Sequence, residues 1–168
     1  MRPSKTTADA GRDRPEIVED LNRLMAEEAE ACLRYFQMRF RLRGQDREAA
    51  EQFLEDAIKE TLEHATAVAT QIKAIGEVPT LRIDLSLGGG PMRLETALAE
   101  ALEVEQAALD AYKDFLPRVA GDPLLEPFSR RQVEIETEHV REIREFVQQH
   151  AAVKLVAKSR SSRSGPSR

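Results

Sequence analysis

Tryptophan is absent from the sequence, cysteine occurs once, and the aromatic residues together make up only 5% of the chain. The single cysteine, Cys32, excludes an internal disulfide and is typical of proteins that fold in a reducing compartment. No hydrophobic run is as long as a membrane span, and the polar start lacks the apolar segment of a secretory signal. We therefore expect a cytoplasmic protein without a membrane anchor.

Charged residues, in contrast, make up 33% of the sequence, and the formal net charge is −5. This acidic balance argues against a general nucleic-acid binder, which needs a basic surface. Alanine, glutamate, leucine and arginine are abundant, whereas the β-branched and aromatic residues that favour sheets are fewer. The composition and the length of 168 residues predict one all-α domain with a buried core.

Hydrophobic residues recur at helical spacing in four long segments, which glycine and proline residues delimit. We predict helices over about residues 15–44, 46–76, 91–119 and 123–150. Residues 1–14 are polar and are expected to form a flexible N-terminus. Residues 151–168 carry five basic and no acidic side chains, and we expect a basic, disordered tail there. The folded domain is therefore predicted to span residues 15–150.

The connection between the second and third predicted helices, Glu77–Gly90, is 14 residues long. Extended chain of that length reaches about 46 Å at roughly 3.3 Å per residue, which matches a helix of about 30 residues. Such a long connection is unusual in a compact domain unless it crosses the whole length of a bundle. The sequence therefore predicts a four-helix bundle with one long crossover between its second and third helices, which is the ferritin-like topology.

A short motif occurs twice, once in the first predicted helix and once in the third. A glutamate is followed after three residues by an alanine and after seven by a tyrosine: Glu28, Ala31 and Tyr35, then Glu105, Ala108 and Tyr112. The two tyrosines either donate hydrogen bonds to metal-binding carboxylates or fill the core. The repeat indicates two related helical hairpins.

A histidine follows each copy of the motif in the next predicted helix. His139 lies three residues after Glu136, so that both side chains share one helix face, and His64 is its counterpart in the first hairpin. Each histidine is about as far from its interhelical turn as the motif glutamate is, so these residues should meet near mid-bundle. A glutamate from one helix and an E-x-x-H pair from the next, occurring twice, is the ligand set of dimetal-carboxylate bundles.

Carboxylates and imidazoles suit iron and manganese ions, and a bridging carboxylate can hold two ions roughly 3.5–4 Å apart. Burying several carboxylates without a cation is costly, so acids that face the core at this density need a metal or protons. The alternative is that the individual glutamates are solvated surface acids. The candidate ligands from this pattern are Glu28, His64, Glu105, Glu136 and His139.

Several segments resemble the bacterioferritins, within the wider ferritin-like superfamily that also includes the rubrerythrins. They are Leu21-Asn22, Glu28, Ala31 and Tyr35-Phe36, then Glu63-His64-Ala65, Ile72 and Gly76-x-x-Pro79. The resemblance covers about residues 15–150 and implies a bundle that binds two iron ions, or manganese, and oxidises Fe(II) with oxygen or peroxide. It also implies a homo-oligomer, which in the bacterioferritins is a cage that stores ferric mineral.

Two positions depart from the bacterioferritin pattern. The family has a glutamate three residues before the first histidine, whereas this sequence has Thr61 there. The neighbouring acid, Glu60, either replaces the missing metal ligand or faces solvent. The methionine that binds haem in bacterioferritins is replaced by Leu62, so we expect no haem. The single cysteine also excludes a rubredoxin domain of the kind found in rubrerythrins, which needs four thiolates.

Three functions remain open at this point. The first is an Fe(II) oxidase that acts in iron storage or detoxification. The second is a non-catalytic bundle, metal-binding or assembly-forming, that lost activity together with the carboxylate at Thr61. The third is a peroxide-handling protein, similar to the di-manganese catalases or the rubrerythrins, which use related ligands.

Overall fold

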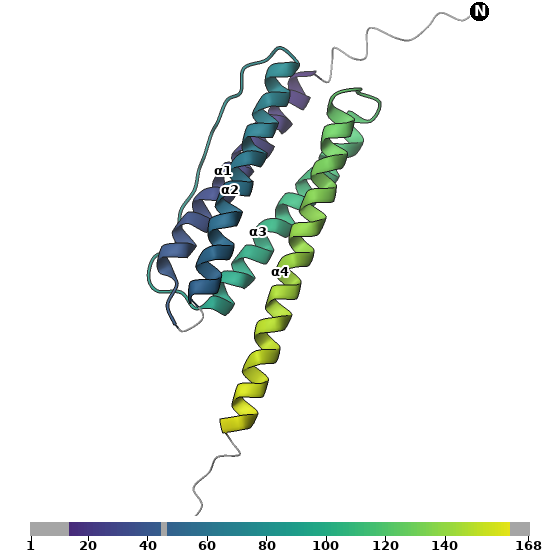
Figure 1. The fold of residues 1–168 in the computed structure, drawn as a ribbon. Coiled ribbons are helices and arrows are strands. Elements are labelled where there is room, and N and C mark those ends of the chain that lie inside the picture. The colour runs from purple at the N-terminus through teal and green to yellow at the C-terminus, as the bar shows by residue number, and fades with distance from the viewer. Residues whose placement is uncertain (1–13, 45–46, 162–168) are drawn as a thin grey trace, which may run out of the picture.

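The computed structural model describes residues 14–44 and 47–161 of the chain. Within these residues it contains four long α-helices and no named strand (Figure 1). They are α1 (Arg14–Arg41), α2 (Arg47–Ala74), α3 (Leu94–Phe115) and α4 (Leu125–Ser161), with a short 3-10 helix, η1 (Leu116–Val119), after α3. The predicted all-α four-helix bundle is confirmed. The flexible N-terminus predicted for residues 1–14 falls on residues 1–13, which lie outside the described residues, and on Arg14, which begins α1.

The helices form two antiparallel hairpins, α1 with α2 and α3 with α4, joined by one long connection (Figure 1). The beginning of this connection lies against the first turns of α1, because the Thr80 N–H donates a 2.7 Å hydrogen bond to Asn22 Oδ1. Its end lies against the last turn of α1, where Arg41 donates from Nε to the Gly90 carbonyl at 2.9 Å. A parallel bridge between Leu42 and Met92 closes the same end. The connection therefore runs the length of α1, and the predicted crossover topology is confirmed.

Two helix ends differ from the predicted positions, and local backbone or capping interactions explain both. The first helix ends at Arg41, before Gly44, whose φ of 118° only glycine adopts without strain. Helix α4 begins where Asp122 Oδ1 accepts hydrogen bonds from the backbone N–H groups of Leu124 and Leu125, both at 2.8 Å.

Helix α4 also continues past the predicted end near residue 150 and reaches Ser161. The expected disorder of residues 151–168 is therefore wrong for residues 151–161, and residues 162–168 lie outside the described part of the chain. The sequence contains no glycine or proline between Pro127 and Gly165, so nothing in the backbone chemistry ends the helix earlier.

The core consists of two groups of buried hydrophobic residues, one toward each end of the bundle. One includes Leu21, Leu24, Val68, Ile72, Tyr112 and Phe115, and the other includes Tyr35, Met38, Leu42, Leu54, Leu98 and Ile143. Along α1, Glu28 lies between Leu24 of the first group and Tyr35 of the second. The polar residues at this level are therefore enclosed between two hydrophobic groups, which keep most water away from them.

No helix among the described residues is both long enough and apolar enough to cross a membrane.

Candidate metal centre

Each of the four helices contributes a buried or largely buried polar side chain at the level between the two hydrophobic groups. These are Glu28 from α1, His64 from α2, Glu105 from α3, and Glu136 and His139 from α4. The glutamate side chains are 1–7% exposed and those of the histidines 11–17%. The structure thus brings the five residues of the sequence pattern together at one height.

Glu136 lies between the two histidines and approaches both. Its Oε1 is 3.0 Å from Nδ1 of His64, and its Oε2 is 3.6 Å from Nδ1 of His139. The two imidazole rings are nearly parallel, with centroids 5.4 Å apart and planes inclined by 10°. One carboxylate therefore spans two facing nitrogen donors, as a bridging ligand of two ions would.

A second carboxylate faces each histidine from the neighbouring helix. Glu28 Oε2 is 3.6 Å from Nδ1 of His64, and Glu105 Oε2 is 3.3 Å from Nδ1 of His139. Each Nδ1 thus meets one carboxylate of its own and one oxygen of Glu136. The arrangement is two similar halves that share Glu136.

Two buried polar atoms in this group have no hydrogen-bond partner among the described residues: Nδ1 of His64 and Oε1 of Glu136. They lie 3.0 Å apart, yet their geometry is not that of a hydrogen bond. Donor atoms of His64, Glu136 and His139 also lie within 4.8 Å of one another. Converging lone pairs of nitrogen and carboxylate oxygen fit a divalent transition-metal ion, so the residues present suit an ion of that class.

The two tyrosines of the repeated motif bind the carboxylates crosswise between α1 and α3. Tyr112 on α3 donates to Glu28 Oε1 at 2.9 Å, and Tyr35 on α1 donates to Glu105 Oε1. Burial raises the pKa of both phenols well above the usual value, and the adjacent carboxylates raise it further. Both tyrosines therefore remain protonated and orient one oxygen of each glutamate away from the centre.

The carboxylates change the protonation of the histidines. Burial lowers the pKa of His64, but Glu136 and Glu28 outweigh it and raise the pKa to about 10. Burial also lowers the pKa of His139, and Glu105 and Glu136 raise it to about 10. Without a metal, both rings are therefore imidazolium cations at neutral pH, and an ion that binds Nδ1 must displace a proton from it.

The carboxylates differ from one another in their affinity for protons. Burial raises the pKa of Glu136, but contacts with the protonated His139 and His64 outweigh this and lower it to about 2. Burial also raises the pKa of Glu28, and the charge of Glu136 adds to this against the opposing effects of His64 and Tyr112. Glu136 is therefore the carboxylate that stays ionised between the two rings.

The position equivalent to Glu136 on α2 carries no carboxylate. Thr61 is buried there, and its Oγ1 donates to the carbonyl of Ala57 at 2.8 Å. The neighbouring Glu60 is 53% exposed, and its Oε2 lies 3.7 Å from Nε2 of His139. Glu60 thus approaches the opposite ring nitrogen from the one that Glu105 and Glu136 face.

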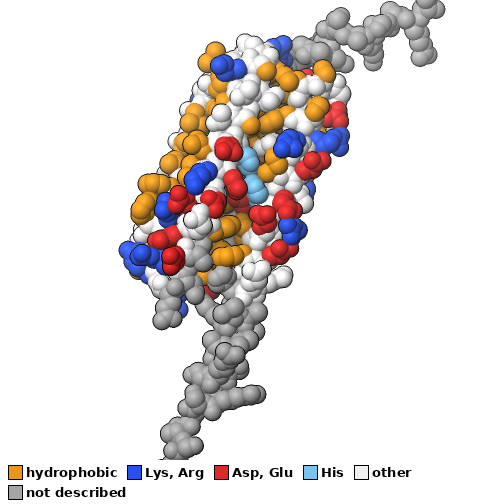
Figure 2. Space-filling view, in the orientation of Figure 1, with side chains coloured by type: hydrophobic (Ala, Val, Ile, Leu, Met, Phe, Trp, Pro, Cys, Tyr) orange, Lys and Arg blue, Asp and Glu red, His pale blue; other side chains and the backbone are white. Residues whose placement is uncertain are grey.

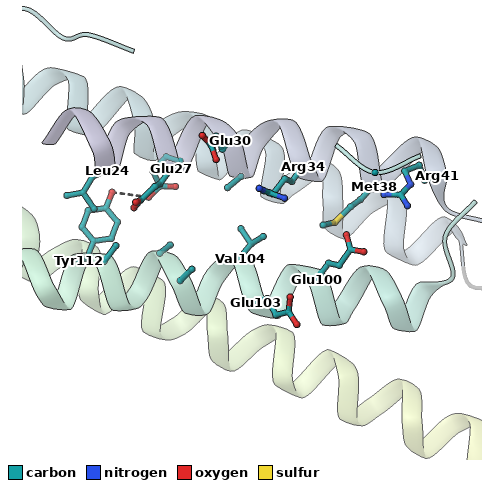
Figure 3. A pocket seen from close by; sticks show the side chains of 16 residues that line it. Leu24, Glu27, Glu30, Arg34, Met38, Arg41, Glu100, Glu103, Val104 and Tyr112 are labelled. Atoms are coloured by element: carbon teal, nitrogen blue, oxygen red, sulfur yellow. Dashed lines mark hydrogen bonds between the residues drawn. The ribbon is translucent and has the colours of Figure 1, made fainter. Parts of the chain in front are cut away.

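The centre is accessible at the surface between α2 and α4. Figure 2 shows histidine side chains (pale blue) at this face among acidic side chains. On the α1–α3 side, a groove of about 710 Å³ lies over Glu28 and Tyr112 (Figure 3). Its lining carries five acids from α1 and α3, Glu27 and Glu103 among them, against Arg34 and Arg41, and this net negative charge favours cations.

The sequence pattern did not identify Gln132. It lies on α4 one turn before Glu136 and is 4% exposed, and its buried Nε2 has no hydrogen-bond partner among the described residues. Its i, i+4 relation to Glu136 on the inward face of α4 is the signal that could have indicated it.

Comparison with known proteins agrees with this fold. A family profile described as the ferritin-like domain matches residues 18–153. No curated protein matches the sequence. All solved structures named below are under 25% identical and therefore support the fold alone.

A ferritin-like diiron-carboxylate protein from Bacillus anthracis str. Ames is 24% identical, with a TM-score of 0.72 over 82% of this chain and 99% of that one. The dodecameric thioferritin of Bacteroides fragilis, a bacterioferritin-related protein, is 19% identical, with a TM-score of 0.77 over 88% and 94%. The bacterioferritin of Desulfovibrio desulfuricans is 21% identical, with a TM-score of 0.75 over 86% of both chains. With a family match that spans most of its length, this chain belongs to the ferritin-like family.

Proposed function

We propose that the protein binds two iron ions at this centre and oxidises Fe(II) with oxygen or peroxide, in iron storage or detoxification. The observation that carries the proposal is the position of Glu136, whose two oxygens face the Nδ1 atoms of His64 and His139. A surface acid would not be 1% exposed between two histidines, because burial of an unpaired carboxylate is costly.

The two halves of the centre support an assignment of ligands to each ion. Glu28 and His64 would hold one ion, Glu105 and His139 the other, and Glu136 both. Bound Fe(II) is the substrate and supplies the electrons that reduce the oxidant. The carboxylates favour Fe(III) over Fe(II) by their charge, and Tyr35 and Tyr112 fix the direction of Glu105 and Glu28.

The test compares three forms of the protein, each freed of metal, loaded with Fe(II) under nitrogen, and mixed with aerated buffer. The wild type should develop ferric absorption faster than buffer, whereas Glu105→Ala should lose most of this rate because one ion loses its own carboxylate. Asp114→Ala is the matched control, because Asp114 is an exposed acid on the same helix and does not line the groove. Oxidation by all three forms at the rate of buffer would contradict the proposal.

One observation favours a second candidate, a bundle that binds metal without catalysis. Thr61 turns its hydroxyl to the backbone, so the centre has one bridging carboxylate instead of two. A metal pair fixed by one bridge is less rigid, and loosely held sites lose rate. Metal bound in stoichiometric amounts without Fe(II) oxidation would support this candidate, and peroxide disproportionation by the manganese-loaded protein would support a catalase-like activity instead.

We also infer self-association in the cytoplasm. The outer faces of α1 and α2 carry exposed hydrophobic side chains, and Leu33, Phe36 and Phe40 lie on one stripe of α1. Phe36 and Phe40 are 53% and 62% exposed with ring centroids 5.1 Å apart, and such apolar stripes are commonly covered by another subunit. The free Cys32 agrees with a reducing compartment.

A further inference from the structure

The imidazole of His139 has acidic partners on both of its nitrogens. Glu105 and Glu136 face Nδ1 at 3.3 and 3.6 Å, while Glu60 Oε2 faces Nε2 at 3.7 Å. The two nitrogens of an imidazole point in diverging directions, and a partner on one determines which tautomer the other presents. The position of Glu60 relative to His139 is therefore informative about which nitrogen is available to a metal.

We propose that Glu60 is a positioning residue that accepts the Nε2–H of His139 and thereby holds the Nδ1 lone pair toward the ion. The proposal rests on the metal binding proposed above and gives Glu60 a role different from that of a ligand. In metal proteins, a ligating histidine commonly donates its second N–H to a carboxylate, which fixes the ring and raises its basicity. Glu60 Oε2 and His139 Nε2, which face each other across α2 and α4 at 3.7 Å, are placed to form such a pair.

The geometry argues against Glu60 as a replacement for the missing bridge. An ion held by Nδ1 of His139 lies on the ring edge that faces Glu105 and Glu136. Glu60 approaches from the other edge and would have to pass around the ring to reach that ion. Its side chain is 53% exposed, so it has the rotamer freedom to shorten 3.7 Å to a hydrogen bond once Nε2 carries the only ring proton.

The same arrangement makes the two halves of the centre unequal. Within the described part of the chain, His64 contacts two acids, Glu28 and Glu136. It makes both contacts through Nδ1. No carboxylate is found at its Nε2 in the residues that the structure describes, so its ring lacks the support that Glu60 gives His139. We therefore expect the ion on His139 to be the more tightly held of the two.

The experiment uses the full-length protein labelled with 15N in its histidines, both metal-free and loaded with Zn(II), which is diamagnetic. In the loaded wild type, the nitrogen shifts of His139 should show a protonated Nε2 and a metal-bound Nδ1. Competition titrations with a chelator measure the affinity for each of the two Zn(II) ions. Glu60→Ala should lower the affinity for one of the two ions by about 10–100-fold, the range typical for loss of such a partner.

Two further variants separate the roles. Glu60→Gln keeps an oxygen that accepts the Nε2–H, so it should retain the tautomer and lose less affinity than Glu60→Ala. Glu63→Gln removes an exposed charge from the same stretch of α2 and should match the wild type. If Glu60 were a ligand, Glu60→Gln would lower the affinity for the ion as strongly as Glu60→Ala does. That result would overturn the proposal.

The outcomes also separate this inference from the proposed function. Unchanged affinity and an unchanged His139 signal in Glu60→Ala, in a protein that does load two ions, would overturn the inference alone. A wild type that loads no metal would overturn both. A wild type that shows the predicted Glu60 effect but does not oxidise Fe(II) would leave the inference standing and remove the oxidase function.

Discussion

Thr61 and Glu136 occupy equivalent positions on α2 and α4, each three residues before a histidine, but only Glu136 lies between the two rings. Thr61 is equally buried, at 4% exposure, and hydrogen-bonds to Ala57 and Ile58 of its own helix. The approximate twofold symmetry of the centre is therefore broken at one residue.

The substitution Thr61→Glu should restore the second bridge. We expect tighter binding of the weaker ion and faster Fe(II) oxidation, because the pair would be fixed from both sides. The metal-free variant should lose about 1–3 kcal/mol of unfolding free energy, because another carboxylate is buried without a cation. Chelator competition and denaturant unfolding measure the two effects. Two equally tight ions in the wild type would show that the second bridge is not needed.

Tyr112→Phe should lower the affinity for the ion held by Glu28. Removal of the phenolic hydroxyl leaves Glu28 Oε1 without its donor, and a hydrogen bond to a charged group contributes about 1.5–3 kcal/mol. Tyr35→Phe should have the matching effect on the ion held by Glu105, so each variant serves as the control for the other. Co(II) titration followed by visible absorption would resolve the two ions. Isotherms that coincide with the wild type would show that both tyrosines only fill the core.

The stability of the metal-free protein should depend on pH in two windows. The pKa values of His64 and His139 are raised to about 10, so their contribution is complete below about pH 6.5 and is lost as the pH rises toward 10. The pKa of Glu136 is lowered to about 2, so its contribution is present above about pH 4.5 and is lost as the pH falls toward 2. Thermal unfolding in chelator should therefore give the highest Tm between these windows.

Metal should remove the alkaline part of this dependence, because an ion replaces the proton on each Nδ1. The control is the same pH series with the protein loaded with Zn(II), and proton release on loading can be measured at pH 8 in weak buffer. If the Tm varied with pH in the same way with and without metal, the ions would bind elsewhere.

Phe36→Glu combined with Phe40→Glu should reduce self-association without unfolding the bundle. Both side chains are more than half exposed, so the charge is placed on the surface and not in the core. Light scattering after size exclusion gives the mass, and circular dichroism reports the helix content. Leu124→Glu, at an exposed site beyond α3, is the control and should keep the wild-type mass. A wild type that is already monomeric would contradict the inference.

Protein expressed with ample haem should show no stoichiometric Soret band. Leu62 stands at the position of the bacterioferritin methionine, is 57% exposed, and offers no sulfur to iron. The measurement is the visible spectrum of the purified protein, with haem-soaked protein after desalting as the control for loose binding. A spectrum of bis-methionine haem would contradict the prediction.

The fold followed from a few features of the sequence, and chief among them was the length of Glu77–Gly90, which allowed only a crossover along the bundle. The convergence of Glu28, His64, Glu105, Glu136 and His139 followed from equal distances to the turns, because helices have a fixed rise. The roles of side chains near these residues could not be obtained in that way. Which ring nitrogen Glu60 faces depends on side-chain rotamers and on the packing of α2 against α4. The spacing of residues along the sequence determines neither of these.

The two halves of the bundle meet at the centre. Tyr35 with Glu105, Tyr112 with Glu28, and His64 with Glu136 each join one hairpin to the other. An ion that binds there clamps the hairpins together, so backbone amides along both sides should exchange with deuterium more slowly as metal is loaded. A chain deprived of metal would open first along this line and offer its helices to proteases, and the lifetime of the protein would then follow the supply of the metal that it binds.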